Sequence, residues 1–405
     1  MATTSFLYHS LGLKGYRHLK TEYKKGRIYH HVEMVREKRR CRGCDAPWHR
    51  LVLDGKFERT IRVLPVGRRK QYVVLHGHEQ HCEVCGQTLR EPITFTDGKR
   101  RHSRSFARYV IDLCLTMTIK HVARLLGVGW DLVKDIHKDH LTKRLKRRRL
   151  SKVRYIAVDE FAVRKGHNYM TVVLDLETGE ILHAHEGKDA SALIPFLWKL
   201  RRRHARLRAV AMDMSQAYMN AVREVFGGKL DIVHDPYHVV ALANFAIDET
   251  RRDMYRDLEG QERKVLKGTR FLLLKGLEKL KVKALERLMV LMELNEPLYQ
   301  VYLLKEDLRM FWNMPDRESG NQFLDAWIAE ARATELKHFV KLANTIDDHR
   351  EGLLAYFDHR VSTAPLEGLN NKVKVLKRMA YGYRDSEYFK LRLFFIHESS
   401  YQLVG

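Results

Sequence analysis

The sequence predicts a multidomain α/β protein, because three different patterns follow one another along its 405 residues. Two Cys-x-x-Cys pairs with strand-like segments come first, an amphipathic helical stretch follows, and from residue 151 apolar strands alternate with helices. A chain of this length is expected to hold two to four domains. No stretch approaches the ~18 apolar residues that a membrane span needs.

The distribution of charge along the chain indicates a polyanionic partner. Residues 1–150 hold 34 Lys and Arg against 14 Asp and Glu, and residues 151–405 hold 40 against 36. The N-terminal third therefore carries most of the net charge of +24, which favours nucleic acid through counterion release. One alternative is a basic surface that only keeps the protein soluble. Another is binding to an anionic membrane, but no amphipathic helix rich in Trp, Phe and Leu accompanies the charges. MATTSFLYHS has no secretory pattern, so we expect a cytoplasmic protein that binds double-stranded DNA and no membrane.

The basic N-terminal third contains two cysteine pairs with the same two-residue spacer, CRGC and CEVC. Two such pairs supply four thiolates to one tetrahedral ion. With the strand-like FERTIRVLPV and KQYVVLHGHEQ between them, residues 41–95 are predicted to be a zinc ribbon that follows a basic segment over residues 1–40. Disulfides and a redox motif are the alternatives; the former are rare in the cytosol and the latter needs no second pair. The predicted ligands of one structural Zn²⁺ are Cys41, Cys44, Cys82 and Cys85.

Residues 101–150 have the pattern of a helix-turn-helix domain. Apolar positions at intervals of three and four predict helices over 105–116, 118–126 and 130–141, with Gly127-Val128-Gly129 as the turn and Cys114 in the core. The flanking runs RRHSR and KRLKRRR favour DNA binding over an ordinary helical hairpin. The residues expected to contact DNA are Trp130, Lys134, His137, Lys138, Arg147 and Arg148.

The rest of the chain reads as a sheet with helices. Strands are predicted in RYIAVDEFAV, in a hairpin around Glu177–Gly179, in AVAMDM and in LDIVHD, with helices in DASALIPFLWKLRRRHA and QAYMNAVREVFGG. The order β-β-β-α-β-α-β-α is that of a ribonuclease-H-like fold, with three antiparallel strands beside two parallel ones and helices on both sides. Such a core is expected over 151–238 and 355–405, interrupted by an all-helical insertion over 239–354, whose Leu-rich stretch 271–294 is interpreted as core because it lacks sustained heptads.

Two carboxylates stand on strands that this topology makes neighbours. Asp159 lies within the first strand and Asp213 ends the fourth, where an unpaired buried charge would be costly. Carboxylates are ligands that Mg²⁺ prefers, and two such ions ~4 Å apart serve phosphodiester chemistry. The alternative is that Asp213 caps the next helix. Glu160 is expected on the opposite face of its strand.

A third carboxylate, Glu367, opens a predicted helix in VSTAPLEGLNNKVKVLKRMAYGYR. A glutamate in the first turn of a helix is also commonly a surface residue that the helix dipole favours. Asp235 and His238, directly after the last strand, are candidate auxiliary residues or else an Asp-Pro turn with a capping histidine. In the helical insertion, Trp312 and Trp327 are expected in the core, with stacking on a flipped base as the alternative. The further auxiliary candidates are Asn370 and Asn371, and Lys374, Lys377 and Arg378 are expected to contact DNA.

Three blocks of the sequence resemble the DDE transposases of bacterial insertion sequences, in particular the ISL-three (ISL3) family. They are VDEFAVRKGHNYMTVVLD, AMDMSQAY followed by HDPYHVV, and PLEGLNNKVKVLKRMAYGYR followed by FKLRLFF. The similarity covers nearly the whole chain, because that family also carries an N-terminal zinc ribbon and a helix-turn-helix. Asp235 and His238 resemble the [Cys/Asp]-x-x-His signature of transposases with helical insertions.

The resemblance implies that Asp159, Asp213 and Glu367 are the catalytic triad and bind two Mg²⁺ (or Mn²⁺) ions in each active site. It implies cleavage at terminal inverted repeats and joining of the 3′-hydroxyl to target DNA. We expect a homo-oligomer, a dimer on DNA, in the bacterial nucleoid. Two other functions stay open: a nuclease or resolvase without strand transfer, and a zinc-ribbon/helix-turn-helix regulator with an inactive core, against which the presence of all three acids argues.

Overall fold

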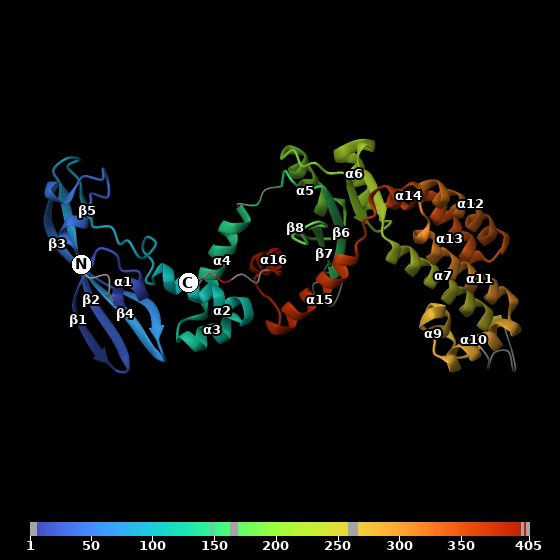
Figure 1. The fold of residues 1–405 in the computed structure, drawn as a ribbon, viewed down its shortest axis with the longest axis horizontal. Helices are drawn as coiled ribbons and strands as arrows, with labels where there is room; N and C mark the ends of the chain where they lie inside the picture. Colours follow the sequence, from blue (N-terminus) through green and yellow to red (C-terminus); the bar gives the residue numbers. More distant parts are fainter. Residues whose placement is uncertain are drawn as a thin grey trace. The chain divides into compact units, whose positions relative to one another are not determined.

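The computed structural model describes residues 6–146, 148, 150–162, 169–257, 266–397 and 401. These residues fall into two compact units, the first made chiefly of the chain up to Lys146 and the second of the chain that continues to His397 (Figure 1). None of the described helices is long and apolar enough to cross a membrane.

A five-stranded sheet forms the first part of the first unit. Its strand order is β1-β2-β4-β3 with β5 paired to β4, and all neighbours are antiparallel except β2 and β4, which are parallel. Its apolar face, with Ile61, Val73 and Leu75 fully buried, packs under the short helix α1 (Phe6–Leu11) and nearby loops. The strands are β1 (Tyr16–Lys24), β2 (Arg27–Met34), β3 (Leu51–Val66), β4 (Arg69–Cys82) and β5 (Thr88–Arg90), with 3-10 turns at Arg36–Lys38 and Trp48–Arg50.

The hairpin of β1 and β2 corrects one expectation from the sequence. The sequence pattern separates residues 1–40, as a basic segment, from the zinc ribbon. In the structure, residues 16–34 belong to the same sheet as the strands that carry the cysteine knuckles. The alternation of buried residues in β2 is the local sign of this, since His30, Val32 and Met34 face the core. The intervening residues, His31 and Glu33, are half-buried, and His30 is itself polar, so the sequence shows no clear alternation of apolar and polar residues here.

Three helices complete the first unit, as predicted: α2 (Arg104–Thr116), α3 (Ile119–Leu126) and α4 (Trp130–Lys146). The hydroxyls of Ser103 and Thr118 cap the first two by accepting backbone N–H groups. Gly127 ends α3 with φ 59° and ψ 50°, a left-handed conformation that glycine adopts without strain. Cys114 is fully buried in the core between the helices, as expected.

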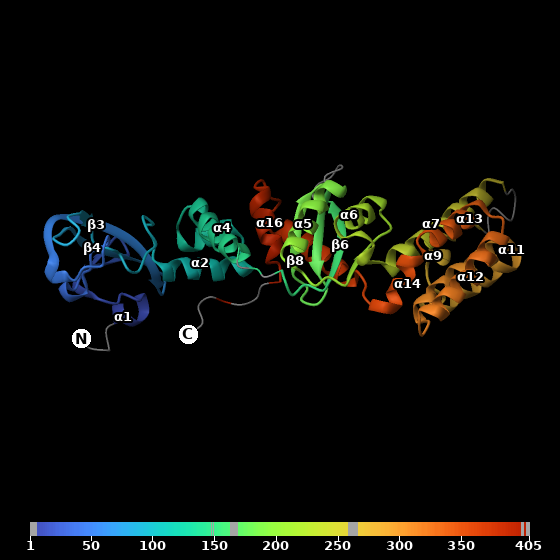
Figure 2. The ribbon, with the colours of Figure 1, turned by 90° about the horizontal axis from the view of Figure 1, so that it is seen from above.

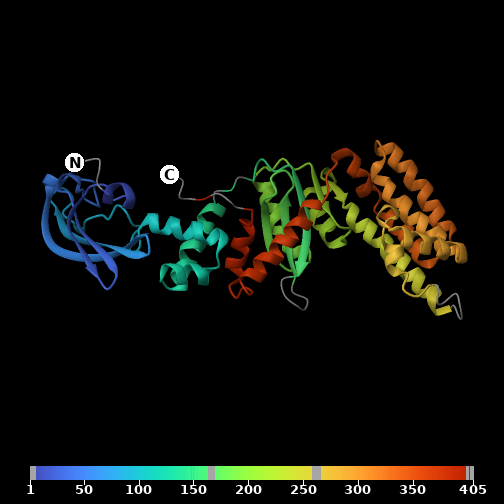
Figure 3. The ribbon, with the colours of Figure 1, turned by 60° about the horizontal axis from the view of Figure 1, so that its bottom comes forward.

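The second unit is built on a sheet of order β10-β9-β6-β7-β8. β6, β7 and β8 are antiparallel neighbours, and β9 and β10 run parallel to β6, which is the strand arrangement expected from the sequence. Helices α5 (Ala190–Arg202) and α6 (Gln216–Phe226) cover one face, and α15 (Ala364–Met379) and α16 (Ser386–Phe394) cover the other (Figure 3). The strands are β6 (Tyr155–Ala162), β7 (Tyr169–Asp175), β8 (Ile181–Glu186), β9 (Ala209–Met212) and β10 (Asp231–His234), with a 3-10 turn at Gly227–Lys229.

The chain between β10 and α15 is helical in its described part. α7 leaves the end of β10, and α7, α11, α12 and α13 pack against one another around a core of their own (Figure 2). α14 packs on β10, with Ala355 against Ala209 and Val233. The helices are α7 (Pro236–Asp257), α9 (Arg270–Leu274), α10 (Val282–Leu294), α11 (Glu296–Met310), α12 (Arg317–Ala333), α13 (Lys337–Asp348) and α14 (Arg350–His359), with 3-10 turns at Leu277–Lys279 and Phe311–Asn313.

The expectation that 271–294 is core holds for only part of that stretch. Leu273, Leu288 and Leu291 are buried, whereas Phe271 is 69% and Val282 73% exposed. Short helices broken at Gly276 and Lys281 bury one side each, so a leucine-rich composition does not by itself place every apolar residue inside. Trp327 is buried as expected, and its indole N–H donates to the carbonyl of Leu304 (2.8 Å), so it belongs to the core.

Candidate functional site

Asp159 and Asp213 lie at the same end of two adjacent parallel strands. The last residue pair between β6 and β9 is Ala157 with Ala211, and each aspartate follows two residues later. The register of the sheet therefore carries both carboxylates to one edge. The charge of Asp213 is close enough to act on the ionisation of Asp159.

The surroundings of Asp159 make its ionised form costly without a cation. Burial raises the pKa of its carboxyl, and the neighbouring Asp213 charge adds to this. Hydrogen bonds from the backbone amide of Glu160 (2.7 Å) and the side-chain amide of Asn370 (3.2 Å) act in the opposite direction, as does the positive charge that His238 can carry.

Asn370 brings the C-terminal helix α15 to this edge. Its nitrogen donates to Asp159, and its buried oxygen accepts no hydrogen bond within the described part of the chain. A buried acceptor without a donor beside two carboxylates is an arrangement that a hard cation satisfies, because Mg²⁺ binds oxygen ligands. The donor set therefore fits a divalent ion.

Glu367 does not join the two aspartates in this structure. It lies in the first turn of α15, exposed, and makes no hydrogen bond or ion pair with any described residue. It stands three residues before Asn370 and so on the same side of the helix. Two of the three predicted carboxylates are thus brought together, and the third is one helical turn from the contact between α15 and Asp159.

Asp213 also makes one contact of the kind that its alternative interpretation, a helix cap, predicts. Its carboxylate accepts the backbone N–H of Ser215 (3.0 Å), which is the N-cap residue of α6. Asp213 itself stands before the cap, and its other oxygen accepts no hydrogen bond from a described residue. One local hydrogen bond therefore leaves the carboxylate with capacity for a ligand.

Asp235 ties the end of β10 to the start of α15. It is 3% exposed, and its carboxylate accepts the backbone N–H of Thr363 (3.1 Å), the N-cap residue of that helix. Its own backbone N–H donates to the carbonyl of Met212, directly before Asp213. Asp235 thus fixes the helix that carries Asn370 relative to the strand that carries Asp213. His238, in the first turn of α7, is half-buried, and a positive charge on it lowers the pKa of Asp159.

On the opposite side of β6, Glu160, Tyr218 and Thr171 form a hydrogen-bonded group that the sequence pattern does not predict. The hydroxyl of Tyr218, a fully buried residue of α6, donates to the Glu160 carboxylate (3.1 Å) and lies 2.8 Å from the hydroxyl of Thr171. Burial raises the pKa of Glu160, the hydrogen bond from Tyr218 lowers it, and the Asp213 charge raises it further. The alternation of the strand places Glu160 on the side of α6, and only the packing of α6 reveals its partner.

The four paired cysteines form a compact cluster in the first unit. Their Sγ atoms lie within 4.8 Å of one another, and the Cys41–Cys85 and Cys44–Cys82 pairs are 3.6 Å apart. A tetrahedral ion with bonds of about 2.3 Å to sulfur has edges of about 3.8 Å, so the cluster is compatible with zinc. The backbone N–H groups of Cys44 and Gly43 lower the pKa of the Cys41 thiol to about 7 against the effect of burial, whereas the pKa values of the Cys44 and Cys85 thiols are raised. Neighbouring thiols disfavour more than one thiolate in the cluster unless a cation is present. Among the described residues this is the only such group of His, Cys, Asp or Glu side chains.

The predicted DNA contacts on α4 divide by exposure. Trp130 is 55% exposed, with the Lys134 ammonium 5.8 Å from its ring centre, and Lys138 is half-buried. His137 is 3% exposed and belongs to the buried side of α4 with Val133 and Ile136, so it cannot face a groove as predicted.

Two further predicted contacts lie after α4. Arg147 lies outside the described residues. Arg148 donates hydrogen bonds to the carbonyls of Ile181 and Phe394 and lies 4.8 Å from the ring centre of Phe395, so its guanidinium is committed to the second unit's own packing. Its place in a basic run concealed this role.

On α15, Lys374 and Arg378 are exposed, as a surface that contacts DNA requires. Lys377 donates to the carbonyl of Ala162 at the end of β6 (3.2 Å), and burial lowers the pKa of its ammonium group. Asn371 is exposed.

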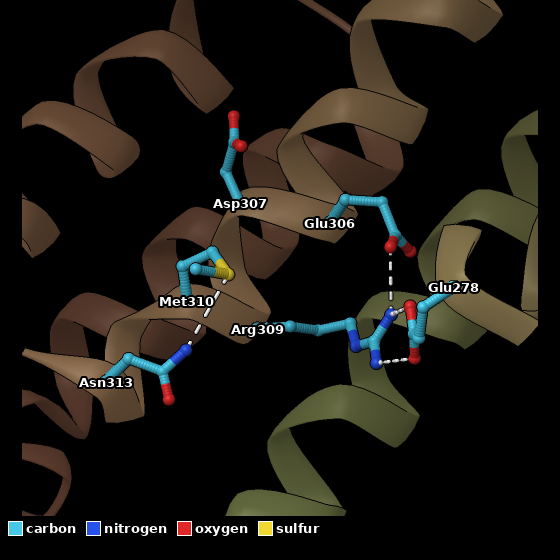
Figure 4. A pocket seen from close by; sticks show the side chains of 6 residues that line it. All are labelled: Glu278, Glu306, Asp307, Arg309, Met310 and Asn313. Atoms are coloured by element: carbon cyan, nitrogen blue, oxygen red, sulfur yellow. Dashed lines mark hydrogen bonds and ion pairs between the residues drawn. The ribbon is translucent and has the colours of Figure 1, made fainter.

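A pocket of about 380 Å³ in the helical region does not have the character of a phosphate site (Figure 4). Three carboxylates line it, and Arg309 is held by two of them, Glu278 and Glu306. Burial and the adjacent Glu306 raise the pKa of Asp307, the third. The candidate site is therefore the sheet edge with Asp159 and Asp213.

Comparison with known proteins gives consistent results over most of the chain. The profile of a transposase family matches residues 156–393, and that of the helix-turn-helix domain of transposase family ISL3 matches residues 91–141. The chain is 33% identical over 341 residues to the transposase for insertion sequence element IS1001 of Bordetella parapertussis, which covers 83% of each chain. It is 29% identical over 376 residues to the transposase for insertion sequence element IS1557 of Mycobacterium tuberculosis, covering 86% of this chain and 83% of the relative.

Among solved structures, the Drosophila P element transposase strand transfer complex aligns with 72% of this chain and 91% of its own, at 10% identity and a TM-score of 0.40. The family assignment rests on the sequence matches, which span both the helix-turn-helix and the unit that carries the two aspartates. The chain belongs to the ISL3 family of transposases.

Proposed function

We propose that the protein binds the ends of an insertion sequence, cuts DNA there and joins the freed 3′-hydroxyl to target DNA. The observation that carries this proposal is the pair of aspartates at one end of adjacent parallel strands, with Asn370 of α15 bonded to Asp159. The strand order and the helices on both faces of the sheet support a ribonuclease-H-like core. The helices from α7 to α14 then form an insertion in that core.

Asp159, Asp213 and Glu367 are the residues that would hold two Mg²⁺ (or Mn²⁺) ions. When bound, such ions lower the pKa of an attacking water or hydroxyl and neutralise charge on the leaving oxygen. Ligation would also remove the cost of burying an ionised Asp159 next to Asp213. Glu367 stands one helical turn before Asn370, which already contacts Asp159, so it is the α15 carboxylate that would complete the ligand set.

The remaining side chains at this edge have positioning roles. Asn370 orients the Asp159 carboxylate, and Asp235 fixes the start of α15. The exposed Lys374 and Arg378 lie on the same helix, where they would bind the phosphates of the DNA being cut. His238 is close enough to Asp159 to influence its charge.

In the first unit, the cysteine cluster would hold one structural Zn²⁺, and α4 would enter the major groove at the element's ends. Trp130, Lys134 and Lys138 are the α4 side chains with access to DNA. We infer that the protein works as a dimer on DNA in the bacterial nucleoid, since two ends must be brought together for joining.

A strand-transfer assay tests this function. The purified chain is incubated with Mg²⁺, a labelled duplex carrying one boundary of the element that contains the gene, and plasmid as target. We expect nicking at the boundary and a labelled plasmid product. Asp213→Asn should abolish both while leaving binding of the duplex intact, because Asn keeps the hydrogen bond to Ser215 but not the negative charge.

Asp189→Asn is the matched control, since Asp189 also precedes a helix of this unit and its carboxylate accepts a hydrogen bond from the neighbouring Ser191 hydroxyl. This variant should remain active. Cleavage without any joined product would favour the nuclease or resolvase, and specific binding without cleavage would favour a regulator. Activity of Asp213→Asn equal to that of the native chain would leave only the capping role for Asp213.

A further inference from the structure

Two β-turns at one end of the first sheet carry a dense group of basic residues. The turn between β1 and β2 reads Lys24-Lys25-Gly26-Arg27, and the turn between β3 and β4 reads Gly67-Arg68-Arg69-Lys70. We call these eight residues the basic turn pair. Six of them are Lys or Arg and none is acidic.

The register of the sheet brings the two turns side by side. β2 starts at Arg27 and β4 at Arg69, and these strands are parallel neighbours with Ile28 opposite Gln71. The cysteine knuckles lie at the other end of β3 and β4, where Leu51 is opposite Cys82. The basic turn pair is therefore a feature of one end of the sheet only.

Three of the six basic side chains are available to an external anion. Lys25, Arg68 and Arg69 are exposed and form no ion pair with any described residue. Lys24 is paired with Glu22, which also binds Lys20. Lys25 has φ 49° and Gly26 φ 71°, a turn geometry that favours Asn or Asp in the first of these positions, yet lysine stands there.

The same end of the sheet is joined to the helix-turn-helix. The Lys70 ammonium donates to the carbonyl of Gly127 (3.3 Å), which ends α3 three residues before α4 starts. The buried Arg62 guanidinium donates to the carbonyl of Leu126 (3.4 Å) and lies 5.0 Å from the ring centre of Tyr72 and 5.5 Å from that of Phe106. The sheet and the turn before α4 are thus held in a fixed relation within this unit.

We propose that the basic turn pair is a second DNA-binding surface, which contacts phosphates flanking the segment that α4 reads. This inference rests on the proposed binding of the element's ends. Arg and Lys on exposed turns supply positive charge but no helix that can enter the major groove and contact base edges. We therefore expect them to contact DNA phosphates and to add affinity rather than sequence preference. Because the turns are fixed to the helix-turn-helix, both surfaces can bind DNA together without ordering a flexible arm.

The test compares two full-length triple variants. In the first, Lys25→Asn, Arg68→Gln and Arg69→Gln remove the unpaired charges, and Asn tolerates the left-handed backbone at residue 25. In the matched control, Lys38→Gln, Arg40→Gln and Lys56→Gln remove three exposed charges of the same unit away from the turns. Binding of fluorescein-labelled duplexes tiled across both boundaries of the element is measured over a range of salt concentrations.

We expect the turn variant to lower the slope of log affinity against log salt by about 2–3, at roughly 0.9 for each phosphate that is no longer neutralised. The control should change the slope by less than about 1. The preference for boundary over scrambled duplex should stay within about threefold of the native value, because binding to phosphates carries little sequence information. Ethylation interference should disappear only at phosphates beside the segment that α4 protects.

An unchanged slope in the turn variant, or an equal loss in the control, would overturn the inference while leaving end binding intact. A collapse of the sequence preference would overturn it as well, since the turns would then act by orienting α4. Failure of the native chain to prefer boundary duplexes would instead remove the proposed end binding, and this inference with it. Zinc content and thermal midpoint of each variant verify that the unit is folded.

Discussion

At the scale of single residues, the environment of each buried polar group decides what it contributes. Asp235 and Asp159 are acids near the same edge, but the first accepts a backbone N–H that fixes a helix, whereas the second lies beside another carboxylate. The first thus holds two elements together, and under the proposed function the second binds a metal ion. This difference comes from partners distant in sequence, such as Thr363 and Asn370.

Asp235 gives a prediction at this scale. Asp235→Ala should lower the free energy of unfolding by about 1–3 kcal/mol, because the buried N–H of Thr363 loses its acceptor. Strand transfer should fall as well, since α15 is no longer fixed. Asp235→Asn keeps an acceptor oxygen and should restore most of both, as measured by urea unfolding and the strand-transfer assay. Equal losses in the two variants would mean that the negative charge matters rather than the hydrogen bond.

His183 on β8 gives a prediction about pH. Burial lowers the pKa of its imidazole to about 4, while its Nε2 lies 2.8 Å from the Ala192 carbonyl and its ring stacks on Phe196. The unfolded chain, with a pKa near 6.5, binds the proton more readily, so stability is complete above about pH 6.5 and is lost as pH falls toward 4. The loss due to His183 should be on the order of 1 kcal/mol per pH unit in this window.

His183→Gln keeps a donor for the Ala192 carbonyl but does not titrate, so urea unfolding of this variant should depend less steeply on pH between 6.5 and 4. The buried His234, whose pKa is also lowered to about 4 by burial, should retain its own share of the dependence. A variant with the native pH dependence would show that the pKa of His183 is not lowered in the folded chain.

At the scale of elements, the first sheet depends on the knuckles at one end of β3 and β4 and on the packing of its apolar face against α1. β3 and β4 extend from the cysteine cluster to the basic turn pair, so loss of the cluster would free one end of the longest hairpin in the described chain. Small metal-bound elements usually require their ion for folding.

We therefore predict about one Zn²⁺ per chain in metal analysis of the purified protein. Cys82→Ser should lose the zinc and, because the sheet that supports the helix-turn-helix melts, the binding of boundary duplexes. Cys114→Ala, which removes a buried thiol outside the cluster, should retain zinc. A folded native chain without zinc, whose four thiols all react with a thiol reagent, would contradict the assignment.

At the scale of the whole molecule, charge and chemistry are divided between two units. The basic surplus lies in residues 1–150, and the aspartates of the candidate active site lie in the second unit. This division agrees with a chain in which one unit locates DNA and the other acts on it.

The division predicts that residues 1–150 alone bind boundary duplexes with a steep dependence on salt, because most of the basic surplus belongs to this part. Residues 151–405 should bind the same duplexes weakly and without preference for the boundary. Electrophoretic shifts with both fragments at several salt concentrations measure this. Equally tight and selective binding by the second fragment would show that end recognition does not reside in the first 150 residues.

The sequence by itself determined the features that depend on local periodicity and spacing. The cysteine pairs and the three helices around Gly127 follow from patterns within short windows. The strand order of the second sheet and the adjacency of Asp159 and Asp213 were expected from the order of strands and helices along the chain, which is that of a ribonuclease-H-like fold. The family resemblance was readable for the same reason, because its motifs are contiguous blocks.

The tertiary structure alone decided which side chains meet across long distances in the chain. It joined β2 to β4, bonded Asn370 to Asp159, buried His137 and turned Arg148 toward β8 and α16. A basic run or a charged strand looks the same in sequence whether its residues face solvent or protein. That choice is set by the free energy of packing between segments far apart in the sequence, which no local period records.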